Sequence, residues 1–261
     1  MLTWIIEPDV FQDTIADLVG AIERHGHRYR FVPAPRAVVG DGSPTVAYGS
    51  VDFVKAVASE GTIEPGVFVS PQFHYTTYSA KLGGSLLNSQ HRLLTYGEID
   101  RHFPTLFPEG AASGPVFARP DSWDKSFAGT LLGPTTFEAD LRRIGFYDLD
   151  PDTPVVLAPF KPIRREWRLV IVADAVVAAC RYDPRNHRGL SPGAPDRVMT
   201  LARSLIAAWQ PDSIYVMDVC ETEDDDLRLL ELNPFNSCDL YLCDRDAVVT
   251  AIADEVRRAR P

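Results

Sequence analysis

The residues best suited to chemistry lie near the C-terminal end of the sequence. Asp218 stands in one run of apolar residues, and Glu231 and Asn233 stand in the next. An acidic run, residues 221–226, separates the two. Like charges between two apolar strands are usually a solvated turn, so we expect the two apolar runs to pair as a β-hairpin.

The register of this hairpin brings the acidic side chains together. If residues 223–226 form a four-residue loop, Thr222 faces Leu227. Counting back along both strands then places Asp218 directly opposite Glu231. Facing residues in a sheet have Cβ atoms about 4.5–5.5 Å apart, so we expect both carboxylates to lie on one patch of the surface.

Asn233 adds a third oxygen donor to this patch. It lies on the same face as Glu231, because side chains alternate with a period of two along a strand. Two carboxylates this close repel each other unless a proton or a cation lies between them, and such oxygen ligands suit Mg²⁺ or Mn²⁺. The alternative is that Asp218 and Glu231 pair with nearby arginines. Three such residues within apolar strands favour a metal site, since charges inside apolar strands need a partner.

The hairpin also resembles a known family. Met-Asp-Val at residues 217–219, followed by Leu-Leu-Glu-Leu-Asn-Pro-Phe at residues 229–235, is similar to the paired metal-binding strands of the ATP-grasp superfamily. The similarity is to the divergent clade that includes the eukaryotic assembly chaperone of a translation initiation factor, with bacterial and phage relatives. It implies an α/β (α+β) fold class, with a small N-terminal α/β (pre-ATP-grasp) domain at residues 1–85 and an ATP-grasp domain at residues 86–261. It also implies ATP and Mg²⁺ as cofactors.

The resemblance extends upstream to a segment with two cations. Residues 117–129 are similar to the strand and loop that hold the nucleotide phosphates in the family, which assigns that role to Arg119 and Lys125. Many members carry lysine where this chain has Arg119. A guanidinium at a strand end offers a fixed fork, whereas Lys125 in a loop offers a point charge that can follow the γ-phosphate. The alternative for each residue is an ordinary surface cation.

Two further segments resemble the nucleotide-binding and catalytic strands of the family. Residues 155–161 are similar to the hinge strand beside the adenine, which places Phe160 near the ring and Lys161 among the nucleotide-binding residues. An ordinary core strand is the alternative. The sequence Glu-Trp-Arg at 166–168 resembles the family's Glu-x-Arg strand, where Glu166 binds the ribose hydroxyls and Arg168 a phosphate or acyl phosphate. Arg168 and Lys125 are therefore the expected catalytic residues.

The acceptor side is less strongly marked. Arg181, at the end of the next strand, is a weak candidate for binding an acceptor carboxylate. Asn236 and Ser237 follow the metal strand at a position where relatives place acceptor-binding groups. A polar turn is an equal alternative for these two residues.

The elements that position these residues follow from hydrophobic periodicity. Strands or short apolar runs are expected at residues 2–6, 29–32, 45–48, 67–69, 116–118, 155–160, 167–172, 176–180, 215–220 and 227–233, and helices at 9–24, 51–58, 196–209 and 244–258. The alternation in the first part predicts a small parallel α/β unit. Thr-x-x-Glu spacing at Thr95 and Thr135 predicts capping boxes that start short helices. The Pro- and Gly-rich residues 107–115 predict a separating loop.

Composition narrows the class of protein. The 261 residues are 45% hydrophobic and 24% charged, as in ordinary globular proteins. A net charge of −10 disfavours nucleic acid and anionic membranes as partners, although Arg164 and Arg165 lie in a local basic cluster that suits a small anion. The four cysteines show no metal-ligand spacing and are expected to be free thiols. With no signal peptide or membrane-spanning run, we expect a cytoplasmic protein.

These observations lead to one main functional hypothesis and two alternatives. The main hypothesis is an ATP- and Mg²⁺-dependent ligase that activates a carboxylate as an acyl phosphate for attack by an amine or similar nucleophile, releasing ADP. Its partners would be small-molecule, peptide or protein carboxylates and amines. One alternative is an ATP-binding assembly factor that acts on a protein partner without ligation. The other is a metal-dependent hydrolase that uses Asp218 and Glu231 alone.

Overall fold

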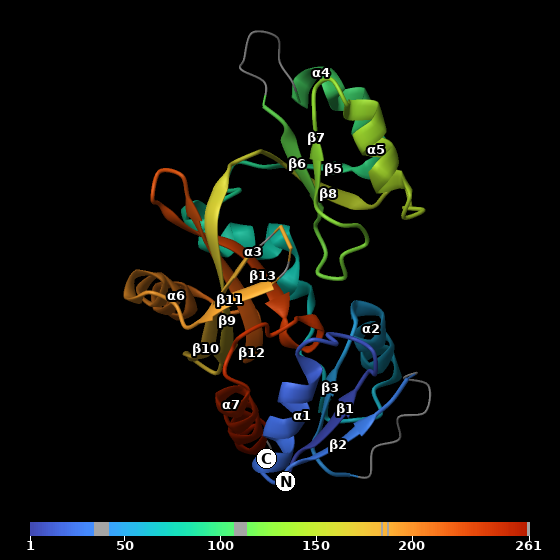
Figure 1. Cartoon of the computed structure of the whole chain (residues 1–261). Helices are drawn as coiled ribbons and strands as arrows, with labels where there is room; N and C mark the ends of the chain where they lie inside the picture. Colours follow the sequence, from blue (N-terminus) through green and yellow to red (C-terminus); the bar gives the residue numbers. More distant parts are fainter. Residues whose placement is uncertain (34–41, 107–113, 184, 187, 260–261) are drawn as a thin grey trace. The chain divides into compact units, whose positions relative to one another are not determined.

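The computed structural model describes residues 1–33, 42–106, 114–183, 185–186 and 188–259 (Figure 1). The chain forms two compact units, one from Met1–Phe73 with Ile163–Pro261 and one from His74–Pro162. These units are not the same segments as the predicted domains 1–85 and 86–261, and that division stays a prediction. Most of the separating loop predicted at 107–115 lies outside the described residues.

The first unit begins with a parallel sheet in the order β2-β1-β3-β4. Its strands and the two helices that connect them are β1 (Thr3–Ile6), α1 (Ile15–Arg24), β2 (Arg28–Phe31), β3 (Thr45–Tyr48), α2 (Val51–Glu60) and β4 (Pro65–Gly66). Strand β3 is buried along its whole length, as expected for a parallel strand covered on both faces. The predicted small parallel α/β unit is therefore confirmed.

Two predicted boundaries in this sheet are wrong. Helix α1 begins at Ile15 and not at residue 9, because Asp9 and Phe11 have left-handed backbone conformations, with φ of 64° and 53°, which a helix cannot contain. The run 67–69 is not a strand. Pairing ends at Gly66, whose φ of 70° turns the chain away from the sheet.

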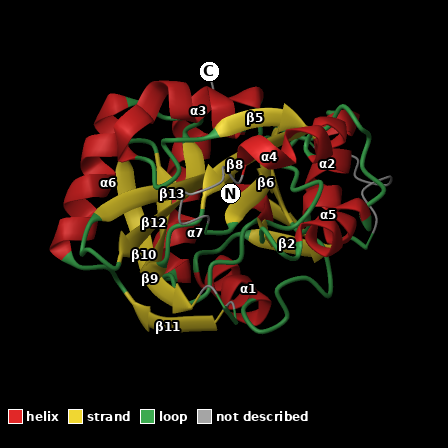
Figure 2. Cartoon of the chain, turned by 90° about the horizontal axis from the view of Figure 1, so that it is seen from above, coloured by secondary structure: helices red, strands yellow, loops and turns green. Residues whose placement is uncertain are grey.

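The same unit contains a five-stranded antiparallel sheet in the order β11-β10-β9-β12-β13. Its elements are β9 (Ile163–Val172), β10 (Ala175–Asp183), β11 (Arg188–Pro192), α6 (Asp196–Ala208), β12 (Ile214–Thr222), β13 (Leu227–Pro234) and α7 (Arg245–Arg258). Helix α7 packs on the sheet face that carries Val170 and Val216. Helix α6 contacts β10 and β12 and flanks the sheet in Figure 2.

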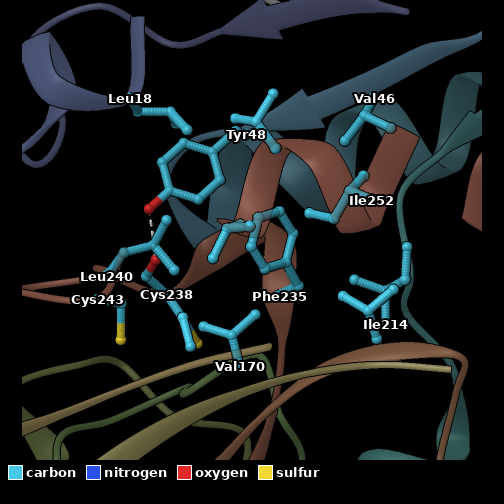
Figure 3. Packing of buried hydrophobic residues seen from close by; sticks show 14 of the residues in the cluster. Leu18, Val46, Tyr48, Val170, Ile214, Phe235, Cys238, Leu240, Cys243 and Ile252 are labelled. Carbon is cyan, nitrogen blue, oxygen red and sulfur yellow. Dashed lines mark hydrogen bonds between the residues drawn. The ribbon is translucent and has the colours of Figure 1, made fainter. Parts of the chain in front are cut away.

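One hydrophobic core joins the two sheets of this unit (Figure 3). Tyr48 on β3 is buried, and its hydroxyl donates a 2.6 Å hydrogen bond to the carbonyl oxygen of Cys238. Phe235 packs between the sheets, with its ring centroid 5.6 Å from that of Tyr48 and 6.3 Å from that of Trp4. The segment that follows β13 is thus fixed against the N-terminal sheet.

The second unit is built on an antiparallel sheet in the order β5-β8-β6-β7. Its elements are α3 (Tyr75–Leu82), β5 (Arg92–Thr95), α4 (Phe103–Leu106), β6 (Val116–Pro120), β7 (Thr130–Leu132), α5 (Phe137–Gly145) and β8 (Pro154–Pro159). The capping box predicted at Thr95 is present and starts the 3₁₀ helix Tyr96–Glu98. Helix α5 confirms the second helix, but its N-cap is Thr136 and no capping box forms, since the Thr136 hydroxyl bonds Asp140 instead.

Two further predictions concern single residue types and helix length. All four cysteines are buried and free, as predicted. None of the helices in the described part of the chain has the length and apolar character needed to cross a membrane.

Candidate functional site

The hairpin of β12 and β13 places Asp218 directly opposite Glu231, as the sequence predicts. The register beside the turn differs from the prediction. Glu221, and not Thr222, pairs with Leu227, and the turn closes with a 2.9 Å bond from the Thr222 amide to the Asp226 carbonyl. A β-bulge then shifts the pairing by one residue and restores the expected partner of Asp218.

Asp218 is the most enclosed member of this site. It is fully buried and faces Arg168 on its other side, since β12 lies between β9 and β13. The guanidinium Nε and Nη2 donate bonds of 2.9 and 2.8 Å to its two carboxylate oxygens. Asn233 is also buried, and its Nδ2 lies 3.4 Å from Asp218 Oδ2. The two carboxylate oxygens have about four acceptor positions, so this pair leaves capacity for a cation.

Arg168 is held from a third direction. Its Nη1 donates a 2.7 Å bond to the carbonyl oxygen of Asp239, in the segment before α7. Burial lowers the pKa of this guanidinium, but the adjacent Asp218 carboxylate outweighs burial and raises the pKa above its usual value. Arg168 is therefore a fixed positive charge at the centre of the site.

Glu166 lies two residues before Arg168 on the same face of β9. Burial is the main reason that its pKa rises to about 7, and repulsion from Asp218 and Glu231 adds to the rise. A hydrogen bond with Tyr182 and the charge of Arg168 act in the opposite direction. The raised pKa shows that three carboxylates exceed the positive charge that Arg168 supplies.

This surplus of negative charge is the observation that tests whether the residues fit a divalent cation. Asp218, Glu231 and Asn233 offer only oxygen ligands in a partly buried setting, which is the donor set that Mg²⁺ prefers. Among the described residues, no three His, Cys, Asp or Glu side chains form a metal-binding group. The candidate set has two carboxylates and one amide, and it leaves positions for the oxygens of a ligand or water.

The basic cluster at the start of β9 has a structural role. Arg164 and Arg165 both bond Oε2 of the fully buried Glu221, at 3.2 and 3.1 Å, and Arg197 pairs with its other oxygen. Arg164 also pairs with Asp225 in the turn. These arginines neutralise a buried carboxylate of the hairpin, which explains their clustering without an external anion.

The acceptor-side candidates are not grouped with Arg168. Arg181 pairs in register with Trp167 while Cys180 pairs with Arg168, so Arg181 projects from the opposite face of the sheet. The Asn236 amide is fully buried: its Oδ1 accepts a 2.7 Å bond from the Phe68 amide.

The other end of the Asn236 amide is also engaged. Its Nδ2 donates a 2.6 Å bond to the Ala47 carbonyl, so this side chain ties β3 to the segment before Phe73. Ser237 is half-buried beside it, at the end of the 3₁₀ helix Phe235–Ser237. The acceptor roles of Arg181, Asn236 and Ser237 stay predictions.

The remaining candidates belong to the second unit. Arg119 is half-buried on β6, and its guanidinium lies 5.2 Å from the ring centroid of Tyr75. Lys125 is exposed in the loop after β6 and has a positive φ of 49°. Phe160 is 44% exposed after β8, and Lys161 donates a 2.6 Å bond from Nζ to the Leu87 carbonyl. The nucleotide-binding roles of all four stay predictions.

Sequence reasoning missed two aromatic residues beside Arg168. Tyr182 and Tyr241 stack on each other with centroids 5.0 Å apart, and the Arg168 guanidinium lies within 5.3 Å of both ring centroids. Tyr182 could have been found, because it follows Cys180 by two residues on a predicted strand. Tyr241 lies between elements, where no periodicity places it.

A search with models of known protein families matches residues 50–252 to a family described as an ATP-grasp domain, family 3 of its clade. The match covers more than half of the chain and includes every candidate residue named above. A search of curated protein sequences found no match.

Solved structures of low sequence identity share the fold. The structure of D-cycloserine synthetase DcsG is 12% identical with a TM-score of 0.67, and the alignment covers 98% of this chain and 100% of that chain. A RimK domain protein ATP-grasp from Sphaerobacter thermophilus is 18% identical with a TM-score of 0.66, over 98% and 99%. The ATP-grasp ligase PsnB complexed with minimal precursor, Mg and ADP is 15% identical with a TM-score of 0.56, over 98% and 97%.

Proposed function

Because the chain belongs to the ATP-grasp superfamily, we propose that it is an ATP- and Mg²⁺-dependent ligase that releases ADP. Its substrates are a carboxylate, activated as an acyl phosphate, and an amine or similar nucleophile. The structural neighbours support this class of reaction, since they include a synthetase and a peptide ligase bound to Mg and ADP.

One observation carries the proposal. Asp218 and Glu231 face each other on β12 and β13, with Asn233 on the same face and the Arg168 guanidinium bonded to Asp218. The group combines oxygen ligands for a cation with a fixed positive charge beside them. Phosphoryl transfer needs that combination, because negative charge develops on the transferring phosphoryl group and its leaving oxygen.

Asp218, Glu231 and Asn233 would hold Mg²⁺, which supplies charge neutralisation at the nucleotide phosphates. Arg168 binds the terminal phosphoryl oxygens and later those of the acyl phosphate. Glu166 accepts hydrogen bonds from the ribose hydroxyls. Positioning and charge, rather than a side-chain nucleophile, then account for the rate.

The reaction has two steps. A substrate carboxylate oxygen attacks the γ-phosphorus of ATP, the bond from that phosphorus to the β,γ-bridging oxygen breaks, and ADP leaves. The amine nitrogen then attacks the acyl carbon, the carbon–oxygen bond to phosphate breaks, and inorganic phosphate leaves while the nitrogen loses a proton. In the second unit, Arg119 and Lys125 contribute positive charge to phosphate binding, and Phe160 and Lys161 contribute to adenine recognition.

The test is a screen for ADP release with Mg²⁺, ATP and pairs of carboxylates and amines, including amino acids and short peptides. We expect ADP and phosphate to appear in equal amounts with a productive pair. Glu231→Gln should lower the rate at least a hundredfold, because it removes one cation-binding charge.

Glu223→Gln is the matched control, since Glu223 is exposed in the turn of the same hairpin. It should keep the wild-type rate. Full ADP release by Glu231→Gln would contradict the proposal. Nucleotide binding without turnover across the screen, with capture of a single protein partner, would instead favour an assembly factor.

A further inference from the structure

We propose that Tyr241, supported by Tyr182 and Asp239, is a positioning residue that fixes the Arg168 guanidinium for contact with the terminal phosphate of the nucleotide. The role of Arg168 itself rests on the proposed function. The new element is the aromatic wall and the segment before α7 that carries it.

The first observation is the environment of the guanidinium. Its Cζ lies 4.9 Å from the ring centroid of Tyr241 and 5.3 Å from that of Tyr182. The two rings are nearly parallel, with an interplanar angle of 19°, and both residues are buried. A desolvated guanidinium near aromatic faces gains a favourable cation–π interaction, which holds it in one plane.

The second observation is the backbone of Tyr241, which has a left-handed φ of 46°. A bulky residue rarely adopts this conformation, and it persists only where the surroundings hold it. Asp239 does so, because its Oδ1 accepts a 2.9 Å bond from the Tyr241 amide. The Thr14 hydroxyl donates a 2.8 Å bond to the same oxygen.

The third observation ties this segment to Arg168 and to α7. The Asp239 carbonyl accepts the bond from Arg168 Nη1 described above. Arg245, buried at the start of α7, donates from Nη1 to the Leu240 carbonyl at 3.1 Å and from Nη2 to the Tyr241 carbonyl at 2.5 Å. The segment is therefore fixed at several points, and it places a strained tyrosine where its ring meets the guanidinium.

These contacts leave Arg168 little freedom to rotate before a nucleotide arrives. Nε and Nη2 bond Asp218, Nη1 bonds Asp239, and the rings restrict the plane of the group. A group held in place before binding loses less conformational entropy when it contacts a phosphate. Tyr241 should then matter for ligands that reach Arg168 and not for those that fall short of it.

The experiment compares two nucleotides by calorimetry in Mg²⁺, AMP-PNP with a terminal phosphate and ADP without one. Tyr241→Leu should weaken AMP-PNP binding roughly five- to tenfold, the loss expected for a buried cation–π contact, and leave ADP within twofold. Tyr241→Phe keeps the ring and should bind as the wild type does. Arg168→Lys should abolish the preference for AMP-PNP, and adding Tyr241→Leu to it should cause no further loss, because the two act through one contact.

Tyr215→Leu is the matched control. Tyr215 is fully buried on β12, but three residues from Asp218 it projects from the opposite face of the sheet. It should weaken both nucleotides equally or neither. Equal weakening of AMP-PNP and ADP by Tyr241→Leu would overturn the inference, since a merely structural tyrosine would behave in that way.

A second measurement separates this inference from the proposed function. The rotation rate about the Nε–Cζ bond of Arg168, measured by NMR without nucleotide, should rise in Tyr241→Leu and stay unchanged in Tyr215→Leu. An unchanged rate in Tyr241→Leu overturns the positioning role, whatever the protein binds. If the wild type binds neither nucleotide, the proposed function fails, and the rotation rate still decides whether Tyr241 positions Arg168.

Discussion

Arg168 and Asp218 face each other across β9 and β12 and share two hydrogen bonds of 2.9 and 2.8 Å. Both side chains are almost completely buried. The pair is a buried ion pair with a further polar contact on either side, from Asn233 and from Asp239. Removing one partner leaves the other as an uncompensated charge in the interior.

Asp218→Asn should therefore destabilise the protein even without a ligand. The substitution keeps the size of the side chain but removes the charge that balances Arg168, and breaking such a pair costs about 3–5 kcal/mol. The free energy of unfolding, measured in urea without metal, should fall by that amount. Asp226→Asn is the control, because its pair with Arg228 is exposed and should cost less than about 1 kcal/mol. Equal losses in the two variants would contradict the buried role of Asp218.

Glu166 gives the site a pH dependence with a defined sign. Its pKa in the folded protein is about 7, above the usual 4.5, so folding favours the protonated carboxyl. The stability that this group contributes is complete below pH 4.5 and is lost as the pH rises through 7. The whole change is on the order of 3 kcal/mol.

Glu166→Gln should remove this dependence. Measured in EDTA, its free energy of unfolding should gain on that of the wild type by about 2–3 kcal/mol between pH 5 and pH 8. Glu223→Gln, at an exposed position, should show a constant difference from the wild type. A wild-type advantage that grows with pH would show that Glu166 is ionised in the folded state, against its raised pKa.

Asn236 should affect stability more than ligand binding. Its side chain satisfies the Phe68 amide and the Ala47 carbonyl in a fully buried position. Asn236→Ala leaves both groups without their partner, which costs about 2–4 kcal/mol. Chemical denaturation would detect this loss, whereas Ser237→Ala should cost less than about 1 kcal/mol because Ser237 is half-buried. A normal stability for Asn236→Ala, combined with weak acceptor binding, would restore the acceptor role.

The hairpin shows how far the sequence alone could go. Alternation along two apolar strands was enough to pair Asp218 with Glu231, because the period of two constrains every position once one pair is known. The turn was predicted one residue too short, and the bulge between Asp218 and Val219 compensated for it. A bulge depends on local backbone conformation, which residue types in an acidic turn do not specify.

Contacts between distant segments were beyond the sequence. Tyr241 meets Arg168 through a loop with a left-handed residue, and Thr14 reaches Asp239 from 225 positions away. Neither contact has a periodic signal. Asn236 also looked like a possible ligand-binding residue, and only the positions of Ala47 and Phe68 show that its amide is engaged.

The most direct test of the central claim is the Mg²⁺ dependence of nucleotide binding. Calorimetry should detect AMP-PNP binding in Mg²⁺ and at least tenfold weaker binding in EDTA, because Asp218 and Glu231 repel the phosphates without a cation. Glu231→Gln should lose most of the Mg²⁺ effect, and Glu223→Gln should keep it. AMP-PNP binding that is equal with and without Mg²⁺, or that is unchanged in Glu231→Gln, would contradict a magnesium-nucleotide site at Asp218, Glu231 and Asn233.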